Sequence, residues 1–281
     1  MTRIRMALKS AVLLGLGLTL LPASAERKPE WELGLGVAGI DFPLYRGAEE
    51  RRNYLLPIPY FQYHGDFIKI DRDRMRGLLF RHGEVEMDIG VNGSVPVKSS
   101  DTLARSGMPD LDPILEIGPS LNVHLYYDEK RHTNFDLRMP LRAALATNFS
   151  RVEQQGWLFQ PTLNLDLRHV PDNGWKLGLQ ASLIYSDQSY HQYFYGVAPQ
   201  YATATRPAYS ANGGYSGMQA ITALSKRFPG YWVGGFVKWD NLNGAVIADS
   251  PLVTRRQAFS VGFSISWVLT TSNKMVEVSD D

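Results

Sequence analysis

The sequence predicts a single antiparallel transmembrane β-barrel of about 12 strands, with ten as the alternative count and both chain ends on the periplasmic side. The clearest support is residues 259–267, where every odd position is large and apolar and every even position is Ser or Gly. Such a strand can bury one face in hydrocarbon while the other lines a small or wet interior. An export signal and an alternation of long and short connections point the same way. We therefore expect the chain in the outer membrane of a Gram-negative bacterium, in contact with its lipid.

The first 25 residues have the features of a cleaved signal peptide. Arg3, Arg5 and Lys9 precede an apolar stretch at residues 11–21, and Ala-Ser-Ala at 23–25 is a typical cleavage sequence. The apolar stretch is shorter than the roughly 18 to 20 residues that a spanning helix needs, so a retained anchor helix is the less favoured alternative. Because the chain has no cysteine, a lipoprotein anchor and disulfides are excluded.

The barrel is expected at residues 26–267, followed by a polar periplasmic tail at 268–281. Apolar and polar residues alternate most clearly at residues 31–37, 85–91, 115–125, 135–141, 163–167 and 175–183. A soluble sandwich would also alternate, but it needs a partner sheet and rarely follows a signal peptide with so many Trp and Tyr residues. The apolar sets are therefore predicted to face lipid and the polar sets to face the lumen.

The connections alternate in length, as in outer-membrane barrels, where outer loops are long and periplasmic turns short. Short turns with Gly, Pro, Asn or Asp are predicted at residues 64–65, 82–83, 128–132, 170–174 and 229–230. Longer polar stretches lie at residues 41–52, 99–112, 149–155, 188–215 and 241–254. The short connection at 71–74 breaks the rule, so residues 53–82 are expected to be irregular. Pro57, Pro59, Pro140 and Pro161 fall within strands and should bulge or bend them, because each removes a ladder donor.

Charge and composition exclude several functional classes. Removing residues 1–25 moves the formal net charge from +1 to −2, because that segment has three basic and no acidic residues. No basic cluster of the size that nucleic-acid binding needs remains, so no nucleic-acid partner is expected. The six histidines form neither a His-x-x-His pair nor a His-Glu-x-x-His motif, so neither a metal nor a cofactor is expected.

Polar residues predicted to face the lumen form the candidate site. They are Glu84, Glu86, Asp88, Glu116, His124, Asp136, Arg138, Arg142, Asp166, Arg168 and Lys176. The favoured interpretation is mutual charge compensation across neighbouring strands. Solute selectivity and acid/base catalysis by paired carboxylates are the alternatives, and the mixed signs argue against a strongly ion-selective pore. A lipid hydrolase would need Ser120 next to His124 in space, although the two lie about two strand repeats apart.

Residues 188–215 are rich in tyrosine and are predicted to lie on the outer side. They form either an exposed recognition surface or a loop that folds over the barrel mouth and packs on itself.

The chain resembles the MipA/OmpV family of outer-membrane proteins, also called MltA-interacting proteins. The resemblance rests on residues 193–197 (YFYGV), 207–214 (PAYSANGG) and 242–253 (LNGAVIADSPLV). Earlier segments agree in order: 31–36, 43–47 (PLYRG), 57–60 (PIPY) and 118–119. Such chains usually stop at the terminal aromatic residue of the last strand, whereas this chain continues beyond Trp267.

The resemblance implies a non-enzymatic barrel that acts as a scaffold. The namesake member links a lytic murein transglycosylase to a bifunctional murein synthase, and other members are described as porin-like or adhesive. These two murein enzymes are therefore the expected partners on the periplasmic side. A small-solute channel is the alternative, with Arg138, Arg142, Arg168 and Lys176 facing the lumen acids.

Overall fold

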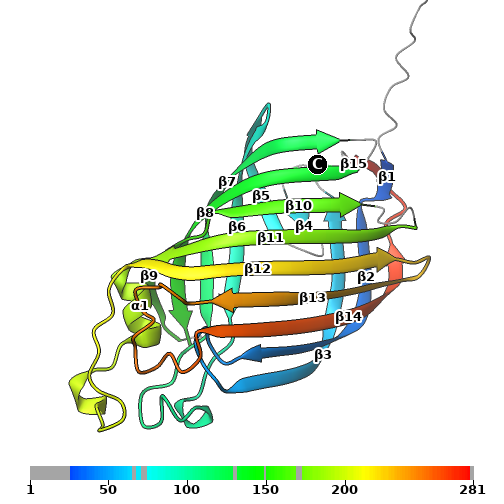
Figure 1. Ribbon diagram of the computed structural model, residues 1–281. Coiled ribbons are helices and arrows are strands. Elements are labelled where there is room, and N and C mark those ends of the chain that lie inside the picture. The colour runs from blue at the N-terminus through cyan, green and yellow to red at the C-terminus, as the bar shows by residue number, and fades with distance from the viewer. Residues whose placement is uncertain are drawn as a thin grey trace, which may run out of the picture.

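The computed structural model describes residues 26–64, 68–70, 75–128, 132–148, 150–168 and 173–278. The predicted signal peptide lies outside these residues, as do the predicted connection at 71–74 and parts of the turns at 128–132 and 170–174. Nearly all of the described structure is antiparallel β-sheet (Figure 1). No helix in the described part of the chain is both long and apolar enough to cross a membrane.

Twelve strands in sequence order form a closed up-and-down barrel, which confirms the predicted fold class. Its elements are β2 (Trp31–Pro43), β3 (Arg51–His64), β4 (Ile68–Ile70), β5 (Met75–His82), β6 (Val85–Ser94), β7 (Ile114–Asp128), β8 (Thr133–Thr147), β9 (Val152–Phe159), β10 (Thr162–Arg168), β11 (Trp175–Ser186), β12 (Gly214–Arg227), β13 (Tyr231–Asn241) and β14 (Gln257–Thr271). Because β9 and β10 both pair with β8 and β11, they are two halves of one strand position. The pairing of β14 with β2, from Val261↔Asp41 to Thr271↔Glu32, closes the cylinder.

The two ends of the barrel differ. One end, called the mouth below, carries α1 (Gln188–Tyr195) and the long loops, including short 3₁₀ turns at Ser99–Asp101 and Pro199–Tyr201. The opposite end, the base, carries both ends of the described chain (Figure 1). There β1 (Glu26–Pro29) and β15 (Met275–Val278) pair as a separate two-stranded sheet. The segment that follows the predicted cleavage point is therefore paired with the C-terminal tail.

The wall has an apolar outer face. Leu35, Leu55 and Phe263 are 59%, 72% and 64% exposed, whereas inward-facing polar residues such as Glu86 and Asn164 are buried. Exposed large apolar side chains also occur on β6, β7, β8, β11 and β14, so the apolar belt surrounds much of the barrel. A belt of this kind is typical of a surface that faces lipid.

The strand prolines have different consequences. Pro161 separates β9 from β10, so the predicted distortion is confirmed there. Near Pro140 the β7–β8 ladder lacks pairs between Ile117↔Ala143 and Ser120↔Pro140, but its register does not shift, so the predicted bulge is not seen at this proline. The same prediction is wrong for Pro57 and Pro59, because β3 stays in unbroken register with β2 from Trp31↔Tyr63 to Pro43↔Arg51. Further distortions in this part of the wall lie between Leu78 and Phe80.

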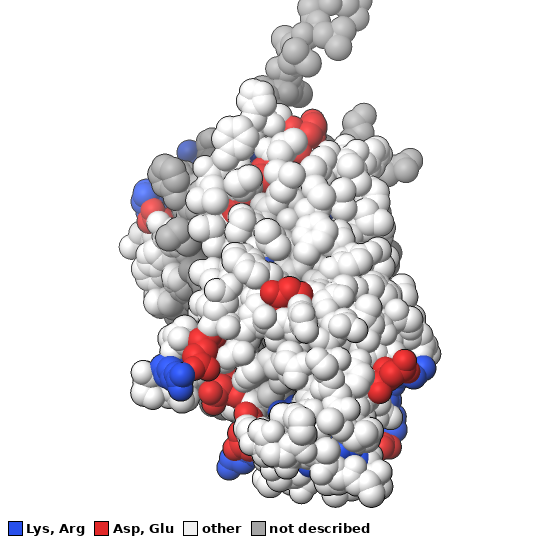
Figure 2. All heavy atoms as spheres, turned by 90° about the vertical axis from the view of Figure 1, so that its left-hand side faces the viewer, with Lys and Arg blue, Asp and Glu red and all other residues white. Residues whose placement is uncertain are grey.

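The main hydrophobic core lies in the mouth rather than along the wall. Its buried members are Leu44, Tyr45, Ala48, Val97, Leu111, Ile114, Ala144, Ala146, Phe194, Tyr195, Ala211, Leu242, Ala245 and Ile247. Apart from Ile114, Ala144 and Ala146, they come from α1 and the loops. We call residues 44–48, 97–111, 187–213 and 242–254 the plug. Viewed from this side, the molecule is mostly uncharged, with acidic and basic side chains in small groups (Figure 2).

The tyrosine-rich segment therefore packs on itself and on its neighbours, which was one of the two predicted outcomes. Tyr190, Tyr193 and Tyr209 pack against the core, Phe194 and Tyr195 belong to it, and Tyr201 packs on a small satellite cluster. The predicted loop at 149–155 is shorter than expected, because β9 begins at Val152.

Candidate functional site: the plugged lumen

A cavity of about 2060 Å³ lies inside the barrel beneath the plug. Its roof includes Leu44, Arg46, Tyr190, His191 and Tyr195 from the plug, and its walls are the inward faces of the strands. Sites that hold drug-sized ligands usually measure about 300 to 1,000 Å³, so this lumen is large for a binding site.

A chain of polar side chains runs across the lumen directly below the plug. Glu116 accepts hydrogen bonds from Asn92 at 3.2 Å and Tyr190 at 3.2 Å, and Arg142 Nε lies 3.2 Å from Glu116 Oε2. Arg142 also donates to Gln160 at 2.5 Å, and Gln160 donates in turn to Gln219 at 3.4 Å. The chain thus ties β6, β7, β8 and β12 to α1.

The far end of this chain is a compact charged cluster. Gln219 donates to Asp240 Oδ1 at 3.2 Å, and Arg46 Nε donates to the same oxygen at 2.9 Å. Lys238 Nζ lies 3.3 Å from Asp240 Oδ2. Burial by itself would lower the pKa of Arg46, but the charge of Asp240 and its hydrogen bond, together with the neighbouring Tyr195 and Tyr190, raise the pKa overall. Arg46 therefore stays cationic and fixes the loop after β2 to β13.

A second polar cluster occupies the middle of β7, β8 and β10. Asp136 lies 2.8 Å from His124 Nδ1 and 3.3 Å from Arg138 Nη2, and it also accepts from Asn164 at 3.4 Å. Arg138 reaches Asp166 at 3.7 Å. Because each cation here lies beside a carboxylate, the cluster is internally compensated.

Further polar contacts lie on the inward face of the wall. Asp88 accepts from Asn122 at 2.9 Å, and Glu86 accepts from Arg81 at 2.7 Å. Glu32 accepts from Arg227 at 2.8 Å and from Tyr60 at 2.9 Å.

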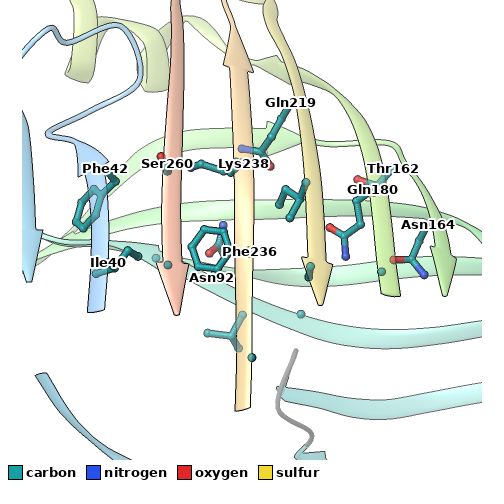
Figure 3. A pocket seen from close by; sticks show the side chains of 18 of the residues that line it. Ile40, Phe42, Asn92, Thr162, Asn164, Gln180, Gln219, Phe236, Lys238 and Ser260 are labelled. Carbon is teal, nitrogen blue, oxygen red and sulfur yellow. The ribbon is translucent and has the colours of Figure 1, made fainter. Parts of the chain in front are cut away.

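Part of the lumen wall is apolar. Ile40, Phe42, Leu56, Ile58 and Phe236 all line the cavity, on β2, β3 and β13. Ile40, Phe42 and Phe236 point into the same space as the polar side chains Asn92, Gln180 and Gln219 (Figure 3). The lumen is consequently amphipathic, with an apolar sector beside a polar one.

Helix α1 is fixed in the mouth by its N-cap and by a glycine. Asp187 accepts a hydrogen bond from Tyr190 N at 2.9 Å, which satisfies a first-turn amide. Gly156 of β9 adopts a φ of +122°, and a Cβ at this position would lie 2.6 Å from Tyr190 N. Only glycine permits this approach of the helix to the wall.

His191 connects α1 to β12. It is fully buried, with Nδ1 2.5 Å from Asn212 O and Nε2 2.5 Å from Ser216 Oγ. Since the carbonyl can only accept, Nδ1 carries the proton and Nε2 accepts from the serine. Burial lowers the pKa of His191, which keeps the ring neutral.

Two buried arginines join the plug loops through carbonyl oxygens. Arg105 donates to Phe194 O at 2.9 Å and to Pro109 O at 3.3 Å. Arg206 donates to Tyr201 O at 2.8 Å, Ala104 O at 3.0 Å and Ser106 O at 2.8 Å. Together they connect the loop at 97–111 to the segment at 187–213.

The residues predicted to face the lumen are placed as follows. Glu86, Asp88, Glu116, His124, Asp136, Arg138, Arg142 and Asp166 take part in the networks above, and Arg168 and Lys176 are register partners that line the cavity. Glu84 lies in the β5–β6 turn and is exposed. Ser120 donates to Asn122 at 3.0 Å, and within the described residues no contact joins Ser120 to His124.

Five residues of the site were not predicted from the sequence: Arg46, Arg105, His191, Arg206 and Asp240. Four of them lie in loops or in α1, where no alternation with a period of two indicates which way a side chain points. Asp240 follows Phe236 and Lys238 at alternate positions of β13, and that alternation was a usable signal. The described residues contain no group of three or more His, Cys, Asp or Glu side chains that could hold a metal ion.

The fold and the site define a closed twelve-stranded β-barrel with an apolar outer belt, a polar lumen and a plugged mouth. Residues 34–269 match the family described as MltA-interacting protein MipA. The chain therefore belongs to the MipA family. A search of curated proteins finds no match.

Proposed function

We propose that this protein is an outer-membrane scaffold without enzymatic activity, which binds the enzymes that cleave and synthesise murein. The observation that carries the proposal is membership of a family described as interacting with MltA. On the proposed assignment, MltA is a lytic murein transglycosylase, and a bifunctional murein synthase is the second partner. The apolar belt supports a place in the membrane, with the base on the periplasmic side.

The plug favours a scaffold function and argues against an open pore. Its core residues Leu242 and Ile247 are 1% and 0% exposed, and it is built from four separate segments of the chain. A pore that conducts freely would need this core to separate. The base offers the surface for partners, because the β1–β15 sheet lies there, away from the mouth (Figure 1).

A pull-down from gently solubilised envelopes tests the proposal. The mature protein should recover a lytic transglycosylase and a murein synthase. A variant truncated after Ser272, which lacks β15, should recover less of both if the base is the contact surface. Glu49→Gln, in the exposed part of the mouth, is the matched control and should recover as much as the unchanged protein. Failure of the unchanged protein to recover either enzyme in mild detergent would contradict the scaffold.

The second candidate is a small-solute channel, which the 2060 Å³ lumen with its paired charges favours. Conductance of the refolded protein in a planar bilayer distinguishes the two. Steady, salt-dependent conductance from a folded barrel supports the channel, and a folded but silent protein supports the scaffold.

A further inference from the structure

The ring of strands is closed, but between β3 and β6 the neighbouring strands pair over only part of their length. Strand β3 is paired along its whole length with β2, but its other edge meets β4 only at Tyr63 and His64. Among the described residues, no strand pairs with residues 51–59 on that edge. On the other side, β6 pairs with β5 only as far as Gly90, so β7 is the one strand in the described part of the chain that pairs with residues 91–94.

The short hairpin between these strands cannot fill the space. Ile70 pairs with Met75, so only four residues join β4 to β5. At about 3.3 Å per residue, four residues that lead out and back can reach no more than roughly 7 Å beyond the pair, whereas residues 51–59 extend over roughly 26 Å. A side opening therefore remains in the half of the wall nearer the mouth, bounded by β3 and β6.

Two prolines occupy the edge of this opening. His64 N donates to Glu30 O at 2.8 Å, so the even-numbered amides of β3 point toward β2 and the odd-numbered amides point toward the opening. Pro57 and Pro59 are odd-numbered and have no amide hydrogen. They remove donors that would otherwise be unpaired in a membrane. They also weaken the edge as a template for an added strand, which argues against a protein strand as its occupant.

Apolar surface continues through the opening into the lumen. Outside, Leu55 of β3 is 72% exposed and Val91 of β6 is 40% exposed. Inside, the next residue of β3, Leu56, lines the cavity and is itself 47% exposed. Ile58 and Phe42 extend this surface, and polar groups such as Asn92 and Lys238 line the same cavity (Figure 3).

We propose that the lumen binds a single-chain amphiphile of the fatty-acid or lysophospholipid class, which enters from the membrane through the β3–β6 opening. The acyl chain lies against Phe42, Leu56 and Ile58, and the polar head lies toward Asn92 and Lys238. Entry from the side fits the plugged mouth, and an amphiphile matches a lumen with one apolar and one polar sector. This inference rests on the membrane location in the proposed function and is independent of any murein partner.

The test uses the folded protein in phosphatidylcholine vesicles with a diazirine-bearing palmitic acid as the probe. After illumination, mass spectrometry maps the labelled residues. We expect adducts on inward-facing Leu56, Ile58 and Phe42 as well as on outward-facing Leu55. Excess oleate should reduce the inward adducts at least fivefold and leave the outward adducts nearly unchanged.

Two variants sharpen the result. The double variant Leu56→Gln, Ile58→Gln should lose most inward adducts at Phe42, whereas the outward control Leu55→Gln should retain them. Adducts confined to outward-facing residues would overturn the lumen site while leaving the membrane location intact. A lack of adducts on the outer belt would instead overturn the membrane location, and with it this inference.

Discussion

Arg206 provides the sharpest test of the plug. It is 9% exposed, and its guanidinium donates to Tyr201 O within its own loop and to Ala104 O and Ser106 O in another. No apolar side chain of similar size can replace these bonds. Arg206→Met keeps much of the volume and leaves the carbonyls of residues 104 and 106 without their donor. The loop at 97–111 should then detach more often from the segment at 187–213.

The expected magnitude follows from the two hydrogen bonds that bridge the loops. A hydrogen bond from a charged donor contributes about 1.5 to 3 kcal/mol. Two such bonds sharing one guanidinium are not additive, so we expect a loss of about 3 kcal/mol in the free energy of local opening. Since every 1.4 kcal/mol is a factor of ten, this loss raises the opening equilibrium roughly 100-fold.

Hydrogen exchange measured across residues 99–111 reports this opening, because Met108 N donates to Arg105 O within the loop. Arg255→Met is the matched control. Arg255 lies 3.1 Å from Glu49, and both side chains are more than half exposed. An exposed pair of this kind contributes about 0.2 to 1 kcal/mol, so exchange should change by less than about fivefold. Equal effects of the two variants would refute the assignment of Arg206 as the tie between the loops.

Three further outcomes are expected. Ile247→Ala, at a fully buried position, should destabilise the plug by about 2 to 5 kcal/mol in hydrogen exchange, whereas Val246→Ala, at a 40% exposed position, should have a much smaller effect. Protection of α1 should fall as the pH drops below about 6.5, because the folded state lowers the pKa of His191 and the opened state then binds more protons; His191→Gln should remove this dependence. Asp240→Asn should lower the free energy of unfolding by about 3 kcal/mol, because it leaves two cations without their shared carboxylate. In heat-modifiable gel migration, the folded band should therefore convert to the unfolded band at a lower temperature.

Which side chains of the wall face the lumen could be predicted from the sequence, because the evidence for it is local. In a strand, successive side chains point to opposite faces, so Glu86, Asp136 and Arg142 could be assigned to the lumen from their apolar neighbours. Glu84 was predicted to face the lumen but does not, because Glu84 lies in a turn, where side chains no longer alternate with a period of two.

The contacts within the lumen could not be predicted, because they depend on which strands are neighbours and in what register. Arg46 and Asp240 are 194 residues apart and meet only because β14 joins β2 and closes the barrel. The helix at 188–195 was missed for a different reason. Its aromatic residues and its N-cap Asp187 are typical of loops as well, and its stability comes from burial in the mouth.

The segments that carry the family resemblance lie mainly in the plug. Residues 43–47, 193–197 and 242–253 supply Leu44, Tyr45, Phe194, Tyr195, Leu242 and Ile247 to its core. A barrel wall needs only alternation, which many sequences satisfy, whereas a packed core over the lumen needs particular side chains at particular places. A barrel that closes its mouth in this way is poorly suited to carry solutes straight through. Two surfaces remain accessible: the base, where we propose that partner proteins bind, and the β3–β6 opening, where we propose that amphiphiles enter from the membrane.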